Sequence, residues 1–166
     1  MKTFSQIEYK RPDFGKLKRD IQAQLKKMRK ARDYAEAKSI YLAIEALMAD
    51  AMTMASVAYI RNTLDTTDAF YDAEMKFFNR AGAMLIPLQK KMNKAMLTSK
   101  FRPDFTREYG EQLFKAMELE DRLQSNKIIL DRIKEGTLEN EYKKLAASCK
   151  VDFMGSECNF YGLLKH

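Results

Sequence analysis

Apolar side chains recur at helical spacing through most of the chain. The first such run, which would form one face of a helix, consists of Leu17, Ile21, Leu25 and Met28. Asp13 precedes it and suits an N-cap, so we expect a helix from Asp13 to about Ala31. A longer run predicts a second helix from Asp33 to about Leu64, with Ile40, Ile44, Leu47, Met48, Ala51, Ala55, Ala58 and Tyr59 at helical spacing.

A third helix is expected after the segment Asp65-Thr66-Thr67-Asp68, which supplies several possible cap oxygens. Acidic residues at its start, namely Asp68, Asp72 and Glu74, suit the positive end of a helix dipole. Pro87 should kink this helix or end its first half, because proline lacks a backbone donor and crowds the preceding turn. Residues 98–103 read as a connection.

The pattern becomes less regular toward the end of the chain. A fourth helix is predicted to carry Phe105, Tyr109, Leu113 and Met117, with Gly110 tolerated inside it at a cost of about 1 kcal/mol relative to alanine. Short helices are expected at about 127–134 and 137–148, separated by Gly136. Alternation at 150–154, a turn at Gly155-Ser156 and a second strand at 158–161 then predict a β-hairpin.

These elements predict an all-α fold, a multi-helix bundle with long kinked helices and a small C-terminal β-hairpin. The chain has 166 residues, of which 46% are hydrophobic, enough for one sizeable core. Only six glycines and three prolines disfavour a many-stranded sandwich or barrel. We place a helical domain at residues 1–149 and the hairpin with a following connection at residues 150–166.

Composition excludes most familiar catalytic sites. The single histidine is His166, so the chain lacks the residues for a histidine-based nucleophilic site or a histidine-rich metal site. No pair of glycines has the spacing of a phosphate-binding loop.

The start lacks a secretion signal, and no uncharged apolar stretch approaches the roughly 20 residues of a membrane span, so we expect a cytoplasmic protein without a membrane partner. Cys149 and Cys158 should then be free thiols.

The positive charge is concentrated in one part of the chain. Residues 10–32 hold ten Lys or Arg against Asp13 and Asp20, a net charge of +8, whereas the whole chain carries +7. This run is either a solvated helix face or a surface for nucleic acid, acidic lipid or an acidic partner. A second run at 90–102 contains cations and no acid. An anion-binding role becomes more favourable if the second run lies beside the first helix.

Two other groups of residues allow more than one interpretation. Asp65, Asp68 and Asp72 could hold a hard cation, but helix capping accounts for them better because the spacing of a calcium loop is missing. The eleven methionines could line an adaptable peptide groove, yet most keep helical core spacing, which favours core filling.

Several motifs resemble one known family. The stretch Ala58 to Glu74, with Ile-Arg, then Asp-Thr, then Asp-x-Phe-Tyr in order, resembles the N-terminal helical region of oligoendopeptidase F-type zinc metallopeptidases, relatives of the thimet oligopeptidases. Four later segments resemble the same region in the same order, namely Ser99-Lys100-Phe101-Arg102, Gly110 to Phe114, Glu141 to Ser148 and Phe153-Met154-Gly155. The resemblance extends from Tyr9-Lys10-Arg11-Pro12 to Leu164.

The resemblance implies a noncatalytic N-terminal domain that forms one wall of a peptide channel. The family's zinc signature, HExxH with a downstream glutamate, is missing, so zinc is implied only for a separate catalytic domain, and this chain should hold no cofactor and be inactive alone. The implied partners are that catalytic domain and an oligopeptide substrate. Asn62 replaces the family's usual histidine. Candidate peptide contacts are Tyr59, Arg61, Asn62, Asp65 and Tyr71.

Alternatives remain at this point. Arg61 and Asp65 are spaced for an intrachain i, i+4 ion pair that would tie the junction instead of binding peptide. The chain could also be an independent basic helical module that binds nucleic acid or an acidic partner, although nucleic-acid binding is disfavoured because the basic helix lacks stacking aromatics. A homodimer through the surface that would otherwise meet the catalytic domain is a third possibility.

Overall fold

Aspartate caps set the starts of the three long N-terminal helices. In the computed structural model, which describes residues 3–163, the Asp13 carboxylate accepts a hydrogen bond from the Lys16 backbone N–H at 2.8 Å. Asp33 accepts one from the Glu36 N–H at 2.8 Å, and Asp68 caps the third helix. These caps satisfy backbone donors that a helix start leaves unpaired, and the helices begin where the sequence predicts.

The elements follow one another with short connections. In chain order they are η1 (Phe4–Gln6), α1 (Phe14–Met28), α2 (Tyr34–Leu64), α3 (Ala69–Leu97), α4 (Arg102–Tyr109), α5 (Glu111–Leu123), η2 (Asn126–Ile128), α6 (Ile129–Ser148), β1 (Val151–Phe153), β2 (Ser156–Cys158) and α7 (Phe160–Leu163). The predicted fold class, an all-α bundle with long kinked helices and a small C-terminal β-hairpin, is confirmed.

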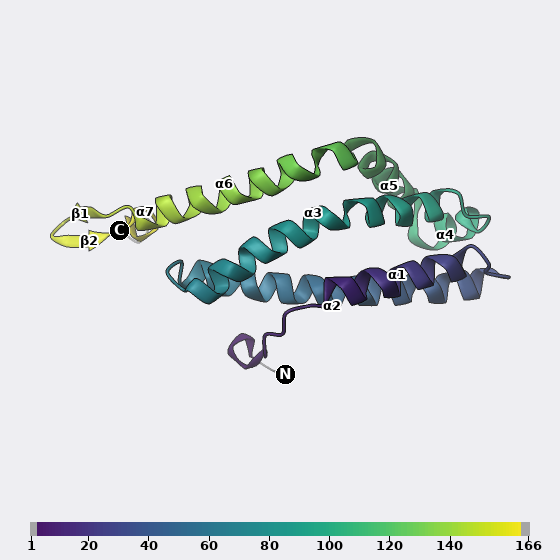
Figure 1. Ribbon diagram of the computed structural model, residues 1–166, viewed down its shortest axis with the longest axis horizontal. Helices are drawn as coiled ribbons and strands as arrows, with labels where there is room; N and C mark the ends of the chain where they lie inside the picture. The colour runs from purple at the N-terminus through teal and green to yellow at the C-terminus, as the bar shows by residue number, and fades with distance from the viewer. Residues whose placement is uncertain (1–2, 164–166) are drawn as a thin grey trace.

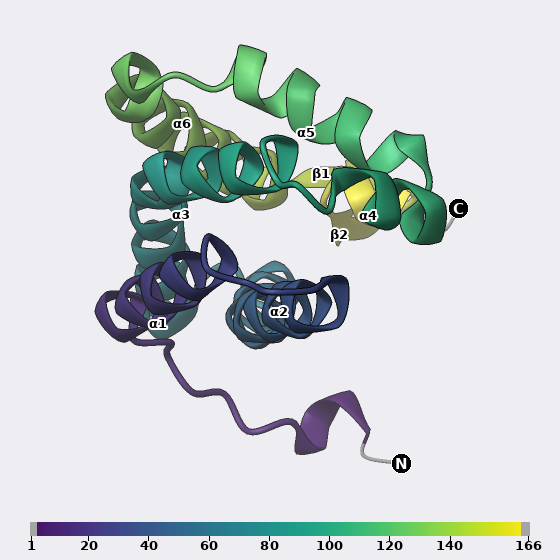
Figure 2. The ribbon, with the colours of Figure 1, turned by 90° about the vertical axis from the view of Figure 1, so that its right-hand side faces the viewer.

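The helices are arranged in layers around α3. Figures 1 and 2 show α1 and α2 side by side on one side of α3, with α5 and α6 on the other. The hairpin and α7 lie beyond the end of α6, away from the ends of α4 and α5 (Figure 1). Helix α3 therefore contacts both layers and holds them together.

The main core lies between α1, α2 and the second half of α3. Its apolar residues include Leu17, Ile21, Leu25 and Met28, the predicted face of the first helix. Phe105 of α4 is fully buried at one end, where its ring meets those of Tyr34 and Tyr41 edge to face at 5.0 and 5.7 Å between centroids. Such edge-to-face pairs add to the stabilisation from apolar burial.

Helix α3 continues through Pro87. Figure 2 shows α3 as two segments that meet at an angle, and Pro87 is its internal proline. The missing donor and the crowded preceding turn account for the bend. The predicted kink is confirmed, and the helix does not end there.

Two glycines behave in the opposite way to the prediction. Gly110, expected inside a helix, separates α4 from α5 with φ +83°, a backbone conformation that favours glycine. Gly136, expected between two helices, lies inside the continuous helix α6. The two short helices predicted for this region are one helix of 20 residues.

The C-terminal hairpin is present with a different register. Phe153 pairs with Ser156 and Val151 with Cys158, so the turn is Met154-Gly155 and not Gly155-Ser156. Both turn residues have positive φ, 54° and 79°, as a tight two-residue hairpin turn requires. The predicted second strand at 158–161 is therefore wrong, because the shorter turn moves the strand to Ser156–Cys158 and α7 begins at Phe160.

Helix α2 meets the length and hydropathy test for a membrane span. Its most apolar 18-residue window has a mean hydropathy of 1.4, with 22% of that window buried. This is weak evidence, since the core helix of a globular bundle passes the same test, and α2 packs along α1 and α3. Both cysteines are free thiols, as predicted.

Candidate functional site

The junction between α2 and α3 brings two of the proposed peptide contacts together. Arg61 donates from Nη1 to the Tyr71 hydroxyl and from Nη2 to the Ile7 carbonyl oxygen, both at 2.6 Å. Its guanidinium also lies 5.7 Å from the Tyr71 ring centroid and 5.8 Å from that of Phe4. Arg61 therefore connects α2, α3 and the N-terminal segment, and its donors are partly used within the chain.

Asp65 does not pair with Arg61 in the part of the chain that the structure describes. It accepts hydrogen bonds from the Thr67 hydroxyl at 2.6 Å and the Thr67 N–H at 2.9 Å. These bonds hold the pKa of Asp65 below its usual range. The i, i+4 ion pair that the spacing allowed is replaced by a local turn, and Arg61 is tied elsewhere.

The other two candidates lie apart from this pair. Tyr59 is partly exposed, and its ring centroid lies 5.4 Å from the Lys143 ammonium of α6. The Asn62 side chain buries its Nδ2 without a hydrogen-bond acceptor among residues 3–163. The five candidates thus share one region. Among the described residues, Arg61 and Tyr71 are the pair of candidates joined by a side-chain hydrogen bond, whereas Asp65 meets Arg61 only through the backbone, where its N–H donates to the Arg61 carbonyl oxygen at 3.2 Å.

Glu74 organises a second cluster that the sequence did not predict. Its side chain is 0% exposed and accepts hydrogen bonds from the Tyr9 hydroxyl and from Arg11 Nε, the latter at 3.0 Å to both carboxylate oxygens. Arg11 Nη2 bonds the same carboxylate, and its guanidinium lies 4.7 Å from the Phe77 ring centroid. We call Tyr9, Arg11 and Glu74 the N-terminal clasp.

The clasp also shifts the acidity of its members. Hydrogen bonds from Arg11 hold the pKa of Glu74 below its usual range, despite the opposing effect of burial. Burial, together with the Glu74 carboxylate, raises the pKa of Tyr9. A signal was present in the sequence, because Glu74 shares a helical face with Phe70, Phe77 and Phe78, where an acid needs a partner.

Helix α6 carries an apolar face that no other element covers among the described residues 3–163. None of its residues is buried. Leu138, Tyr142 and Leu145 stand at helical spacing and are 64%, 71% and 70% exposed. Leu130, two turns before Leu138, is exposed to the same extent. We call these four residues the α6 apolar row. Met154 at the hairpin tip is also exposed.

The family profile of the peptidase M3 N-terminal domain matches residues 4–123. The chain belongs to the peptidase M3 N-terminal domain family. The sequence resemblance to oligoendopeptidase F-type peptidases is thereby confirmed. Comparison with curated proteins found no match.

Solved structures support the same M3 assignment over almost the whole chain. PZ peptidase A, determined with an inhibitor, shares 36% identity and a TM-score of 0.92 over 98% of this chain. A protein assigned as an oligoendopeptidase F shares 33% identity and a TM-score of 0.93 over 99%. A Bacillus anthracis strain Ames protein with the same assignment shares 34% and 0.92 over 98%. This chain spans 29%, 29% and 30% of their respective lengths.

This M3 N-terminal domain does not provide a zinc site in its described part. Among residues 3–163, no group of three His, Cys, Asp or Glu side chains could hold a metal ion. Asp68 caps α3, and Asp72 is paired with Lys76 and Lys144, so the acidic residues of the junction serve the helices. These described residues do not fit a catalytic zinc.

Proposed function

We propose that this chain is the noncatalytic N-terminal domain of an oligoendopeptidase F-like zinc metalloendopeptidase that acts on oligopeptides. The observation that carries the proposal is the match to solved peptidases at TM-scores of 0.92 and 0.93, over chains of which this one spans under a third. In this role the chain forms one wall of the substrate channel, and the zinc-binding catalytic domain is its partner. We place the protein in the cytoplasm.

The α6 apolar row supports a large partner on this side of the molecule. Leu138 and Leu145 leave most of their surface in water, although burying a leucine side chain is worth about 1.5–3 kcal/mol. A contiguous exposed apolar row commonly marks an interface. The additional length of the matched peptidases supplies a candidate occupant, so we assign the row to the contact with the catalytic domain.

We also propose that the α2–α3 junction faces the oligopeptide. The candidate contacts are Tyr59, Arg61, Asn62, Asp65 and Tyr71. The exposed Tyr59 ring offers a surface for stacking or for a hydroxyl hydrogen bond. The guanidinium of Arg61 orients Tyr71, which favours a positioning role for Arg61.

A domain exchange tests the proposal. In a chimera, this chain replaces the matched N-terminal region of the Bacillus anthracis protein, and cleavage of an oligopeptide is measured with and without a zinc chelator. We expect chelator-sensitive cleavage by the chimera, because the backbones superpose at a TM-score of 0.92. A folded, zinc-loaded chimera that cleaves no peptide would contradict the proposal.

Matched variants show which surface is responsible. Leu138→Lys in the α6 apolar row should weaken assembly of the chimera and lower cleavage. Glu139→Gln is the control, because it raises the charge by the same amount at a neighbouring exposed position outside the row. Tyr59→Ala should raise KM by about threefold or more with little change in kcat, since it removes one aromatic contact.

The chain by itself should not cleave peptides. The sequence contains no HExxH motif, and residues 3–163 contain no group that could hold zinc, so this chain lacks the means by which this class of peptidase activates water. The assay incubates the purified 166-residue chain with zinc and an oligopeptide. Chelator-sensitive turnover by the chain alone would show that the noncatalytic assignment is wrong.

A further inference from the structure

The two basic runs of the sequence meet at one cavity. It lies between the end of α1, the last turns of α3 and the link to α4, and its volume is about 470 Å³. The lining residues are Met28, Arg29, Lys94, Ala95, Thr98, Ser99, Lys100 and Phe101. The condition that favoured an anion-binding role in the sequence, proximity of the second run to the first helix, is therefore met at this place.

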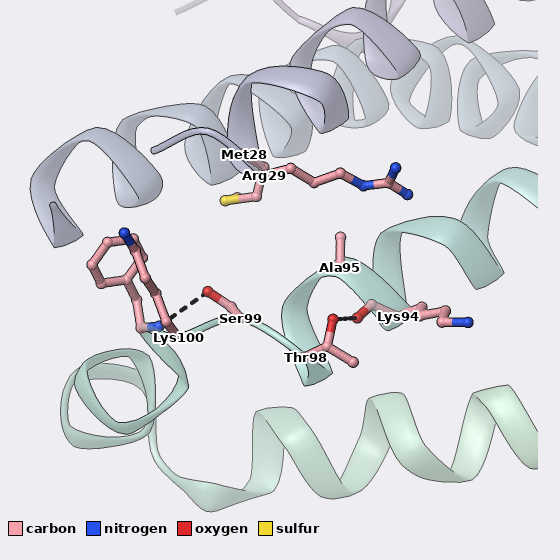
Figure 3. Close-up of a pocket in the computed structure, with 8 residues that line it drawn as sticks. Met28, Arg29, Lys94, Ala95, Thr98, Ser99 and Lys100 are labelled. Carbon is pink, nitrogen blue, oxygen red and sulfur yellow. Dashed lines mark hydrogen bonds between the residues drawn. The ribbon is translucent and has the colours of Figure 1, made fainter. Parts of the chain in front are cut away.

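Three cations line the cavity without a carboxylate. Figure 3 shows Arg29 at the end of α1 and Lys94 on α3 with Ala95 between them, and both side chains extend in the same direction along the edge of the pocket. Lys100 stands at another side, with its ammonium 4.8 Å from the Phe101 ring centroid. Within residues 3–163, none of these three cations forms an ion pair.

Helix dipoles offset only part of this charge. The C-termini of α1 and α3 both end at the cavity, and each contributes about half a negative unit charge. Three full positive charges against two such ends leave an excess of about +2. An unpaired excess of this size in a cavity attracts a multiply charged anion.

Polar and apolar groups complete the lining. Ser99 Oγ accepts from the Phe101 N–H at 3.2 Å, which leaves the Ser99 hydroxyl proton available to donate. Thr98 donates its hydroxyl to the Lys94 carbonyl at 2.8 Å. Met28 and Ala95 supply apolar surface. The volume is within the range of sites for small organic ligands and well above that of a single ion.

We propose that this cavity binds the phosphate group of a small phosphorylated molecule. Phosphate carries more than one charge at neutral pH and accepts hydrogen bonds from several donors at once, which suits two lysines, an arginine and a hydroxyl. A long nucleic acid fits less well, because Phe101, the aromatic residue of the lining, already lies against Lys100. The inference is independent of the proposed peptidase role.

Calorimetric titration tests the site. The 166-residue chain is titrated with inorganic phosphate, pyrophosphate and magnesium-free ATP. We expect one site, with affinity that falls several-fold between about 50 and 200 mM salt. Binding of the inorganic anions alone identifies a free anion as the source, and tighter binding of ATP identifies a phosphorylated organic molecule. Both results support the site.

Charge-removing variants locate the binding. The double variant Lys94→Gln and Lys100→Gln should weaken binding at least about tenfold, because two charge-assisted contacts are lost. Lys91→Gln is the control for the loss of one charge on the same helix, since Lys91 is exposed but lies outside the lining, and the affinity of this variant should stay within about twofold of the wild type. Unchanged thermal melts establish that the variants remain folded.

Three outcomes would overturn the proposal. They are no saturable binding of any probe at about 1 mM, equal weakening by the control and the double variant, and tighter binding of a single-stranded oligonucleotide than of ATP. Neither lysine lies on α6, so a failure here does not bear on the peptidase chimera.

Discussion

A fully buried carboxylate persists only where its charge is matched, because removing an ionised group from water is costly. Glu74 meets this requirement through Arg11 and the Tyr9 hydroxyl. Arg11 itself is 52% exposed, so the pair lies at the boundary between core and solvent. The contact attaches the N-terminal segment to α3, and it depends on the one carboxylate of Glu74.

Replacing Glu74 by glutamine should destabilise the protein by about 2 kcal/mol, because Arg11 and Tyr9 lose their charged acceptor while the buried amide keeps only part of the hydrogen bonding. Urea unfolding followed by circular dichroism gives the free energy. Glu139→Gln, in an exposed i, i+4 pair, makes the same chemical change and should cost less than about 0.5 kcal/mol. Equal costs for both variants would contradict the role of the clasp.

The clasp also predicts a pH dependence. The pKa of Glu74 is lower in the folded protein than in the unfolded chain, so the folded state holds this proton more weakly. The stabilisation is complete above the ordinary glutamate pKa of about 4.3 and disappears as the pH falls through the lower folded value. The stability difference between the wild type and Glu74→Gln should therefore be constant near neutral pH and shrink below about pH 4. Unfolding curves across this range measure it.

At the residue scale, the sequence was informative for local interactions. Asp13 and Asp68 cap helices a few residues away, so their roles follow from neighbours in the chain. The N-terminal clasp joins residues more than 60 positions apart, and the local sequence pattern does not indicate that Glu74 pairs with Arg11 and Tyr9. The sequence pattern alone therefore places Arg11 in the basic run of residues 10–32 and Glu74 at the positive end of a helix dipole.

At the scale of elements, α3 and α6 approach closely where Gly136 meets Asn79. A Cβ at Gly136 would lie 2.9 Å from Asn79 Cγ. The Asn79 Nδ2 is buried without an acceptor among the described residues. The close approach of α3 and α6 thus requires a residue without a side chain at Gly136, and it buries the Asn79 amide without an acceptor among the described residues.

The substitution Gly136→Ala should change sign with its background. In the wild type, the new methyl group meets the Asn79 amide, and we expect a loss of about 1 kcal/mol. In an Asn79→Ala background the methyl group has room, and the higher helix propensity of alanine should stabilise by up to about 1 kcal/mol. A double-mutant cycle from thermal unfolding measures this coupling. Equal effects in both backgrounds would show that the contact is not tight.

Gly110 and Gly136 show why some element boundaries could not be predicted from the sequence. Each glycine interrupts an otherwise helical pattern, and the neighbouring residues do not indicate which of the two ends a helix. Packing distinguishes them, because Gly110 adopts a φ of +83° that lets α5 turn back along α3, whereas Gly136 stays helical to admit Asn79. The hairpin register likewise depended on a methionine, Met154, with positive φ, which composition does not suggest.

For the whole molecule, the exposed α6 apolar row predicts self-association of the 166-residue chain. Sedimentation velocity at rising concentration should show a monomer–dimer equilibrium, since association removes this exposed apolar surface from water. Leu138→Lys should shift the equilibrium to monomer without loss of stability, because Leu138 is mostly exposed. The Glu139→Gln control should leave it unchanged. A strictly monomeric wild-type chain would contradict this expectation.

The arrangement of the whole molecule was the part least accessible from sequence. The helices and the fold class follow from periodicity and caps, and the motif order in Ala58 to Glu74 indicated the family. The placement of Arg29, Lys94 and Lys100 around one cavity, and the Lys144 ion pair with Asp72, depend on how the layers pack. No spacing along the chain encodes these arrangements.

The N-terminal clasp has a kinetic consequence. Joining Arg11 to Glu74 closes a loop of 63 residues, and such a closure costs entropy that is recovered only after α2 and α3 have formed and docked. We expect the contact to be missing from the folding transition state, so Glu74→Gln should speed unfolding and leave the refolding rate nearly unchanged in stopped-flow experiments. The first residues of the chain would then set the lifetime of the native state, although they contribute little to the rate at which it forms.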